Sequence, residues 1–228
     1  MSDDQTPGPA RRVPREEVRR RLLAEAARVF AERGYVDARL EDIAHAAGFT
    51  KGAVYSNFGS KQELFAAVLS DGAEMELAAV MTEIRDTSAL PTLIARVSSL
   101  VTRRIVGDTR RGYFGLEFAA RAARDDRIRS VLTPMRRTQR EGAARSIAEA
   151  AERTGARPSV DPDLAALILH CLTNGLTNEH LADPEKVNTE TIERALSTVL
   201  FCLLPPDRDP VPQPSETGQD ERRNGKSR

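Results

Sequence analysis

The side chains best suited to chemistry in this sequence lie between residues 48 and 64, which read GFTKGAVYSNFGSKQEL. Groups that bind phosphate oxygens are frequent there, and an asparagine amide can also pair with the edge of adenine. Gly52 and Ala53 add no bulk, so a base edge can come close to this stretch. The polar groups that could make such contacts belong to Thr50, Lys51, Tyr55, Ser56, Asn57 and Lys61.

A short helix over residues 51–58 would bring these groups together. Thr50 can cap its N-terminus, where the helix dipole and the free N–H groups attract a phosphate. Ser60 and Glu63 have the spacing of a capping box, which begins the next helix and places Lys61 beside the first one. Two other interpretations stay open: Tyr55 could be a half-buried core residue, and Lys61 could be an ordinary solvated lysine.

The remaining reactive side chains do not form a pattern typical of an enzyme. His45, His170 and His180 lack the spacing of metal ligands, and no glycine-rich loop follows a strand. Cys171 and Cys202 lie far apart in apolar surroundings, so we expect both to be buried free thiols. We therefore expect no catalytic activity, no metal and no cofactor.

The composition favours an all-α protein, because helix-forming residues dominate and tryptophan is absent from the 228 residues. The 34 basic residues balance 34 acidic ones, so a nucleic-acid surface would have to be a local patch. The polar N-terminus predicts no signal peptide, and no apolar run has the length of a membrane span. These features favour a cytoplasmic protein without a membrane partner.

Hydrophobic spacing and helix-end signals predict nine helices. Pro134 is expected to kink or split the seventh of them. Residues 1–13 and 205–228 lack periodicity and contain several prolines, so we predict a disordered arm and a disordered tail. The helices are expected near residues 15–33, 40–47, 51–58, 61–85, 89–107, 110–123, 125–154, 162–182 and 188–204.

The first three helices match a helix-turn-helix unit, because a tight glycine-containing turn joins the second to the third. In such a unit the third helix lies in the major groove of double-stranded DNA and presents its N-terminal residues to the bases. The small core of this unit would consist of Ile43, Ala44, Ala47, Phe49, Val54 and Phe58.

Residues 18–69 contain a run of positions that together form a specific motif: Ala26-Ala27, Phe30, Gly34-Tyr35, Asp42-Ile43-Ala44, Ala47-Gly48, Lys51-Gly52, Val54-Tyr55, Phe58, Ser60-Lys61 and Leu64. With these positions, the segment closely resembles the DNA-binding domain of the TetR (tetracycline-repressor-like) family. The resemblance implies contacts with operator DNA, those of Tyr55 and Lys61 mainly through phosphates. The residues to which it assigns such contacts are Thr50, Lys51, Gly52, Ala53, Tyr55, Ser56, Asn57 and Lys61.

The sequence departs from the family pattern at a few positions near this surface. Ala38 and Arg39 stand where the family usually has Thr or Ser, and we expect Arg39 to hold a phosphate by its charge instead. Glu41 stands where a basic or small polar residue often occurs. These departures affect which base sequence the protein binds as its operator, and they do not affect the expectation that it binds DNA.

The resemblance further implies that residues 14–61 form the DNA-binding domain and residues 62–204 a larger domain for ligand binding and dimerisation. In the family the last two long helices pair with their copies in a second subunit. Two apolar faces agree with such a homodimer, although both could instead pack within one chain. The predicted interface residues are Leu164, Leu167, Ile168, Cys171, Leu172, Ile192, Leu196, Val199 and Leu200.

A pocket for a small apolar or amphipathic ligand is expected between the DNA-binding helices at the N-terminus and this interface. Nearby arginines, Arg103, Arg104, Arg110, Arg111, Arg136 and Arg137, either pair with an anionic ligand or form a solvated face. The predicted lining consists of Val97, Leu100, Val101, Phe114, Phe118 and Met135.

Together these features predict a repressor that a small molecule releases from a palindromic operator. The alternative is a helical dimer that binds a ligand or a protein without binding an operator.

Overall fold

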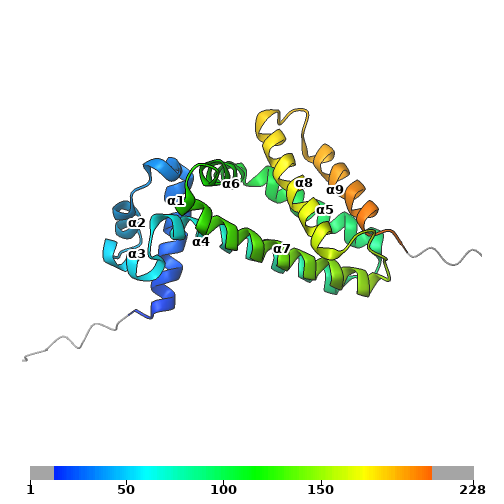
Figure 1. Cartoon of the computed structure of the whole chain (residues 1–228), viewed down its shortest axis with the longest axis horizontal. Helices are drawn as coiled ribbons and strands as arrows, with labels where there is room; N and C mark the ends of the chain where they lie inside the picture. The colour runs from blue at the N-terminus through cyan, green and yellow to red at the C-terminus, as the bar shows by residue number, and fades with distance from the viewer. Residues whose placement is uncertain (1–12, 207–228) are drawn as a thin grey trace, which may run out of the picture.

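The computed structural model describes residues 13–206, which form nine helices and no strand (Figure 1). The predicted all-α fold is confirmed, whereas the predicted arm and tail lie almost entirely outside the described residues. The helices are α1 (Arg15–Asp37), α2 (Leu40–Ala46), α3 (Lys51–Phe58), α4 (Lys61–Asp86), α5 (Leu90–Gly107), α6 (Thr109–Ala122), α7 (Asp126–Thr154), α8 (Pro162–Ala182) and α9 (Thr189–Leu203).

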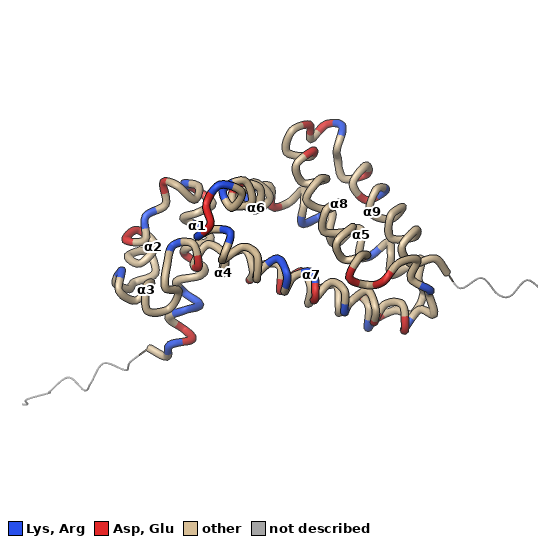
Figure 2. Tube along the Cα trace, in the orientation of Figure 1, with Lys and Arg blue, Asp and Glu red and all other residues tan. Residues whose placement is uncertain are grey.

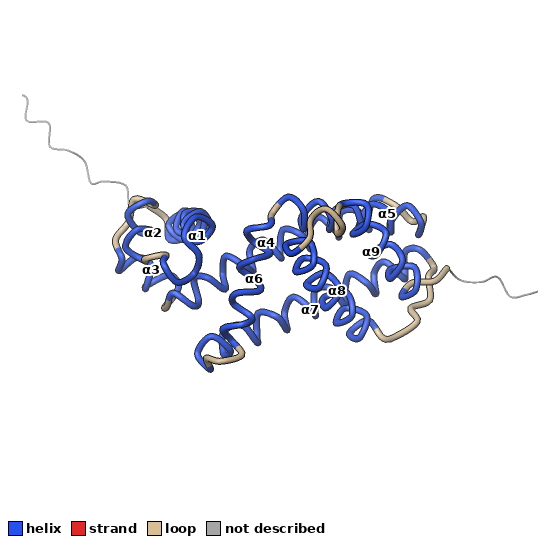
Figure 3. Tube along the Cα trace, turned by 90° about the horizontal axis from the view of Figure 1, so that it is seen from above, coloured by secondary structure: helices blue, strands red, loops and turns tan. Residues whose placement is uncertain are grey.

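The helices are arranged as a small head and a larger body. Helices α1, α2 and α3 gather at one end of the molecule, and α4 leads from this head into the body (Figures 1 and 3). In the body, α4 packs along α7, α7 along α8, and α5 along α9. Helix α6 lies between the two parts and packs on both α7 and α8.

Glycine and proline positions decide where these helices bend or end. Gly34 has a φ of 73°, so the regular part of α1 ends there and a short turn brings Tyr35 into the core. Of the predicted kink or split at Pro134, the split is wrong, because helix α7 runs continuously through this residue; the kink stays a prediction. Pro134 and Ser130, whose carbonyl lacks its usual helical partner, are both exposed, so water can replace the missing hydrogen bond.

An aromatic cluster joins the head to α6. The ring of Phe65 on α4 lies 4.8 Å from that of Phe30, 5.0 Å from that of Tyr35 and 4.8 Å from that of Phe118, centroid to centroid. Phe114 lies 5.9 Å from the same ring. Both phenylalanines of α6 were predicted to line a ligand pocket, but α6 turns this apolar face toward the head, where they are buried.

One side of helix α9 packs within the chain. Ile192 and Leu196 pack with Ile105 of α5, and Leu200 belongs to the main core of the body. Three of the four predicted interface residues of α9, Ile192, Leu196 and Leu200, are buried within the single chain, and the fourth, Val199, is partly buried.

The exposed apolar face of α8 and α9 consists of other residues. Leu164 and Leu167 remain exposed as predicted for an interface, and Phe201 joins them. Cys171 and Cys202 are exposed as well, so the expectation that both thiols are buried is wrong. Ile168, Leu172 and Val199 are partly buried and pack against the core of the body.

Within residues 13–206, no helix has the length and hydropathy that crossing a membrane requires.

Candidate nucleic-acid interface and cavity

Helix α3 has well-defined ends and a small buried side. The hydroxyl of Thr50 caps it by accepting a hydrogen bond from the backbone N–H of Ala53, at 3.3 Å. Gly59 ends it with a φ of 73°, and Val54 and Phe58 anchor it inward. The hydroxyl of Ser60 then accepts from the backbone N–H of Glu63 at 3.1 Å and begins α4.

The outer side of α3 is exposed and carries polar groups. Lys51, Gly52, Tyr55 and Ser56 all face solvent, and Tyr55 is 47% exposed, so it is not a core residue. Figure 2 shows basic residues along α1 and at the start of α3, with acidic residues between them. The predicted local patch therefore has mixed charge, and its shape and hydrogen-bonding groups matter more than its net charge.

Two of the predicted base-reading side chains are engaged within α3. Ser56 donates its hydroxyl to the carbonyl of Ala53 at 3.1 Å, and the amide of Asn57 donates to the same carbonyl at 2.8 Å. Asn57 is only partly exposed, and its Oδ1 is buried without a hydrogen-bond partner in the described chain. To reach a base, the amide of Asn57 has to leave this hydrogen bond.

Two arginines of α1 support the C-terminus of α3. Arg19 donates to the carbonyl of Asn57 at 2.8 Å, and Arg15 donates to the carbonyl of Ser56 at 3.3 Å. The guanidinium of Arg19 also lies 4.3 Å from the ring centroid of Phe58. Cations at a helix C-terminus stabilise it, so these contacts hold α3 in position. Sequence reasoning missed both residues, although their four-residue spacing places them on one face of α1.

Lys51 at the start of α3 is already paired with an acidic residue. Its ammonium lies 2.5 Å from the carboxylate of Glu41, one of the positions that depart from the family pattern. The hydrogen bond between them lowers the pKa of Glu41 and raises the pKa of Lys51. A phosphate has to compete with Glu41 for this cation.

Lys61 is not an ordinary solvated lysine. Its ammonium donates to the carbonyl of Val36 at 3.0 Å and lies 4.8 Å from the ring centroid of Tyr35. Partial burial lowers the pKa of Lys61. The side chain thus ties the start of α4 to the connection between α1 and α2, where Arg39 is exposed.

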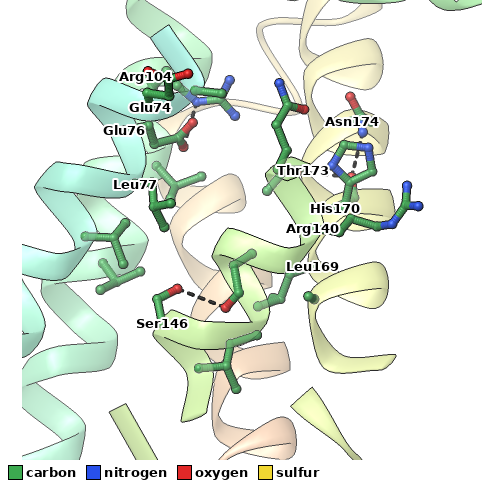
Figure 4. Close-up of a pocket in the computed structure, with 18 of the residues that line it drawn as sticks. Glu74, Glu76, Leu77, Arg104, Arg140, Ser146, Leu169, His170, Thr173 and Asn174 are labelled. Carbon is green, nitrogen blue, oxygen red and sulfur yellow. Dashed lines mark hydrogen bonds and ion pairs between the residues drawn. The ribbon is translucent and has the colours of Figure 1, made fainter. Parts of the chain in front are cut away.

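A cavity of about 600 Å³ lies in the body, among α4, α5, α7 and α8 (Figure 4). Val97, Val101 and Met135 line it as predicted, whereas Leu100 does not. Sequence reasoning missed most of its polar lining, and it named Arg104, Arg111 and Arg136 only as members of a larger arginine set.

Among residues 13–206, no group of His, Cys, Asp and Glu has the arrangement of a metal site.

Arg104 and Arg111 line the cavity on the side of α4. The Nε of Arg104 lies 2.8 Å from the carboxylate of Glu76, whose pKa is raised by burial. Arg111 reaches from α6 to α4 and donates to the carbonyl of Leu69 at 2.9 Å. Its guanidinium fills the space beside Gly72, where a Cβ atom would lie only 1.4 Å from it.

His170 and Arg136 meet on the side of α8. The guanidinium of Arg136 is hydrogen-bonded to Nε2 of His170. Burial, together with the charges of Arg136, Arg140 and Arg104, lowers the pKa of His170 to about 4. The imidazole is therefore neutral at neutral pH and accepts the hydrogen bond, so it does not neutralise the charge of Arg136.

Two family models match this chain. Residues 22–68 match the model of bacterial regulatory proteins of the tetR family, and residues 94–205 match that of the C-terminal part of BetI-type transcriptional repressors. Among curated proteins, the transcriptional activator FasR of Mycolicibacterium smegmatis is 40% identical over 77 residues, which are 34% of this chain and 35% of FasR. The regulator SrpR of Pseudomonas putida is 47% identical over 55 residues, 24% of this chain and 26% of SrpR. The chain thus spans about a quarter to a third of the length of these relatives.

Solved structures share the fold over most of the chain. One from Rhodococcus sp., described as a TetR-family transcriptional regulator, has a TM-score of 0.68 at 23% identity, covering 83% of this chain and 99% of that one. FadR of Bacillus subtilis, solved with stearoyl-CoA, has a TM-score of 0.62 at 16% identity, covering 79% and 96%. A regulator of Saccharomonospora viridis, solved with choline, has a TM-score of 0.61 at 21% identity, covering 83% and 98%.

Proposed function

The chain belongs to the TetR family of bacterial regulatory proteins, and on this premise we propose that it is a dimeric transcriptional repressor released from operator DNA by a small molecule. The observation that carries the proposal is the exposed outer side of α3, where Lys51, Gly52 and Tyr55 face solvent on a capped helix. Repression rather than activation is supported by the repressor-type match over residues 94–205.

In this proposal α3 lies in the major groove. Gly52 has no side chain and its surroundings are open, so bases can come close at this point. Tyr55 and Lys51 contact phosphates, with Lys51 exchanging Glu41 for the DNA. Thr50, Arg39 and Lys61 flank the groove, and Ala53, Ser56 and Asn57 complete the surface. Because the proposed partner is operator DNA, the proposal places the protein in the cytoplasm, and it assigns the protein a binding role without catalysis.

Reading a palindromic operator requires two heads related by a two-fold axis. The exposed apolar residues Leu164, Leu167 and Phe201 on α8 and α9 support a dimer through these two helices. Exposed apolar groups that recur on neighbouring helices typically mark such an interface.

Helix α4 can couple the ligand to the heads, because its start holds the head and its middle lines the cavity. Arg111 ties it to α6 through the carbonyl of Leu69. A ligand that favours a different position of Arg111 would shift α4 and separate the heads from the operator half-sites. Operator and ligand then oppose each other through one conformational equilibrium.

The test is titration of the purified chain with DNA from upstream of its own gene at several salt concentrations. Lys51→Ala should lower the slope of log affinity against log salt by about one, and Tyr55→Phe should weaken binding by about fivefold. Lys186→Ala, an exposed charge change in the body, is the matched control. Absence of salt-sensitive, site-specific binding would support the alternative of a helical dimer that binds no operator.

Ligands of different chemical classes occupy proteins of this fold, as stearoyl-CoA does in FadR and choline in the regulator of Saccharomonospora viridis. The fold alone therefore does not select a ligand, and the residues lining this cavity have to decide it.

A further inference from the structure

The cavity holds more basic than acidic side chains. Five arginines and two glutamates line it. Glu76 is already paired with Arg104, at 2.8 Å. The other acidic residue, Glu74, is exposed and makes no ion pair in the described chain. Acidic groups therefore balance one arginine and leave the remaining ones without a carboxylate.

This imbalance is greatest at the side formed by α7 and α8. The hydrogen-bond partner of Arg136 is the neutral imidazole of His170. Arg140 lies one helical turn further along α7 and makes no hydrogen bond or ion pair with any residue of the described range. Burial and the charge of Arg140 both lower the pKa of Arg136. Two like charges in a partly buried place are costly, and a bound anion offsets that cost.

Much of the remaining cavity wall is aliphatic, although Ser70, Gln139 and Ser146 also line it. Leu77 of α4 lies across from Leu169 of α8 (Figure 4). Val80 of α4 and Leu93 and Val97 of α5 also line the cavity. No phenylalanine, tyrosine or tryptophan of the described residues lines the cavity. A quaternary ammonium group is typically held by aromatic faces, and a planar ring by stacking, so this wall favours an aliphatic chain over either.

The two ends of the cavity differ in what they can still bind. Figure 4 shows His170 and Arg140 on one side and Glu76 with Arg104 on the other. Thr173 and Asn174 stand next to His170, and their side chains already donate to the carbonyl of His170, at 3.1 and 2.7 Å. On the side of His170, free donor capacity therefore lies with Arg136 and Arg140, and both guanidiniums match the oxygens of a carboxylate or phosphate.

We propose that the cavity binds an anionic amphipath, whose acidic headgroup lies at Arg136 and Arg140 beside His170 and whose aliphatic chain lies along α4 and α5. The headgroup is a carboxylate or a phosphate, which share the chemistry that guanidinium groups recognise. This inference rests on the proposed function, because it names the ligand class of the same cavity.

The test is isothermal titration calorimetry of the full chain with four ten-carbon probes, each below its micelle concentration. Decanoate and decyl phosphate carry an acidic headgroup, whereas decanol is neutral and decyltrimethylammonium is cationic. At least one acidic probe should bind about tenfold tighter than both others, because hydrogen bonds to charged groups are the strong ones. The stronger acidic probe identifies the headgroup, and each added methylene should tighten binding by about fourfold.

Variants of α7 locate the headgroup. Arg136→Gln and Arg140→Gln should each remove most of the advantage of the acidic probes over decanol. Arg137→Gln is the matched control, because Arg137 is exposed on the same helix and does not line the cavity. Thermal unfolding of each variant shows that a lost preference does not reflect a lost fold.

Three outcomes would overturn the proposal: decanol or decyltrimethylammonium binding as tightly as the acidic probes, no binding by any of the four, or an unchanged acidic preference in both variants. Operator binding, measured by fluorescence anisotropy without any probe, is a separate readout. Intact operator binding with failed probes rejects the ligand class alone, whereas absent operator binding rejects the proposed function.

Discussion

The head and the body of this protein differ in what lies beside their apolar cores. In the head, Leu22, Phe30 and Ile43 are fully buried, and the polar groups of α3 point outward. In the body, a cavity lies next to the apolar core, and its lining includes the partly buried side chains of Glu76, Arg136 and His170. Burial raises the pKa of Glu76 and lowers the pKa of Arg136 and of His170. A core packed with apolar groups is complete without a partner. A cavity lined by unbalanced charge is completed by what binds inside it.

The largest effect is expected where head and body meet. Phe65→Ala removes the centre of the aromatic cluster and should lower the free energy of unfolding by about 3–5 kcal/mol. Urea denaturation measures it. Met75→Ala, on the same helix but 69% exposed, should change the free energy by less than about 0.5 kcal/mol. Equal effects of the two changes would mean that the cluster does not join the two regions.

The second largest effect is expected from a change of pH, which should alter stability through His170 in the body. The pKa of His170 is about 4 in the folded chain, against an ordinary value of 6.5. Between these values the unfolded chain binds a proton that the folded chain does not, so stability falls as pH drops from 6.5 to 4. Allowing for partial exposure of the ring, the loss is about 1–2 kcal/mol.

Denaturation at pH 7 and pH 4.5 measures this loss as a difference between wild type and His170→Gln, which should lack it. His45→Gln, at an exposed position of the head, is the control. If the pH response of His170→Gln equals that of the wild type, His170 is not the group responsible.

On the outer side of α3, stability and function should respond in opposite directions. A Cβ on Gly52 would meet only the Thr50 hydroxyl, at an ordinary 3.7 Å, so Gly52→Ala should raise the free energy of unfolding by about 0.5–1 kcal/mol. The same methyl would stand between α3 and the bases, and we expect about tenfold weaker operator binding, or about 1.4 kcal/mol. Unchanged operator affinity would show that DNA does not approach α3 at this residue.

The smallest effect concerns the ion pair that competes with DNA. Glu41→Gln frees Lys51 from its carboxylate partner and should tighten operator binding by about two- to fivefold at low salt. Anisotropy titrations at two salt concentrations check this, because the gain should shrink as salt rises. Weaker binding in this variant would indicate that Glu41 positions Lys51 for DNA instead of competing for it.

The two regions also differ in how far their sequence predicts them. The caps of α3 and α4 link residues three apart, Thr50 to Ala53 and Ser60 to Glu63, so local spacing reveals them. Regular hydrophobic spacing likewise predicts all nine helices, and the all-α fold follows. Contacts across the head are harder to predict from the sequence, because they join residues that lie far apart in it. The hydrogen bonds from Arg15 and Arg19 to α3, for example, span about forty positions.

Only part of the cavity lining could be predicted in this way, namely Val97, Val101 and Met135, because the lining comes from separate helices. An amphipathic pattern indicates that one face of α6 is buried but not which core it joins, so Phe114 and Phe118 were assigned to the cavity and lie in the aromatic cluster instead. The same ambiguity applies to α8 and α9: Ile192 and Leu196, predicted for an interface, are buried within the chain, whereas Cys171, expected both as a buried thiol and at the interface, is exposed in the single chain. The pairing of Glu76 with Arg104 depends on α4 and α5 meeting, which no local pattern specifies.

The contact of Arg111 beside Gly72 gives α4 the geometry of a lever. At a rise of 1.5 Å per residue, the helix between Lys61 and Gly72 is about 17 Å long. A tilt of about 5° at that contact would displace the head end of such an arm by about 1.5 Å. Two arms related by a two-fold axis would change the separation of their heads by about 3 Å, close to the 3.4 Å step between stacked base pairs. An angular change too small to disturb the packing of the body could therefore misalign two reading helices by nearly one base pair.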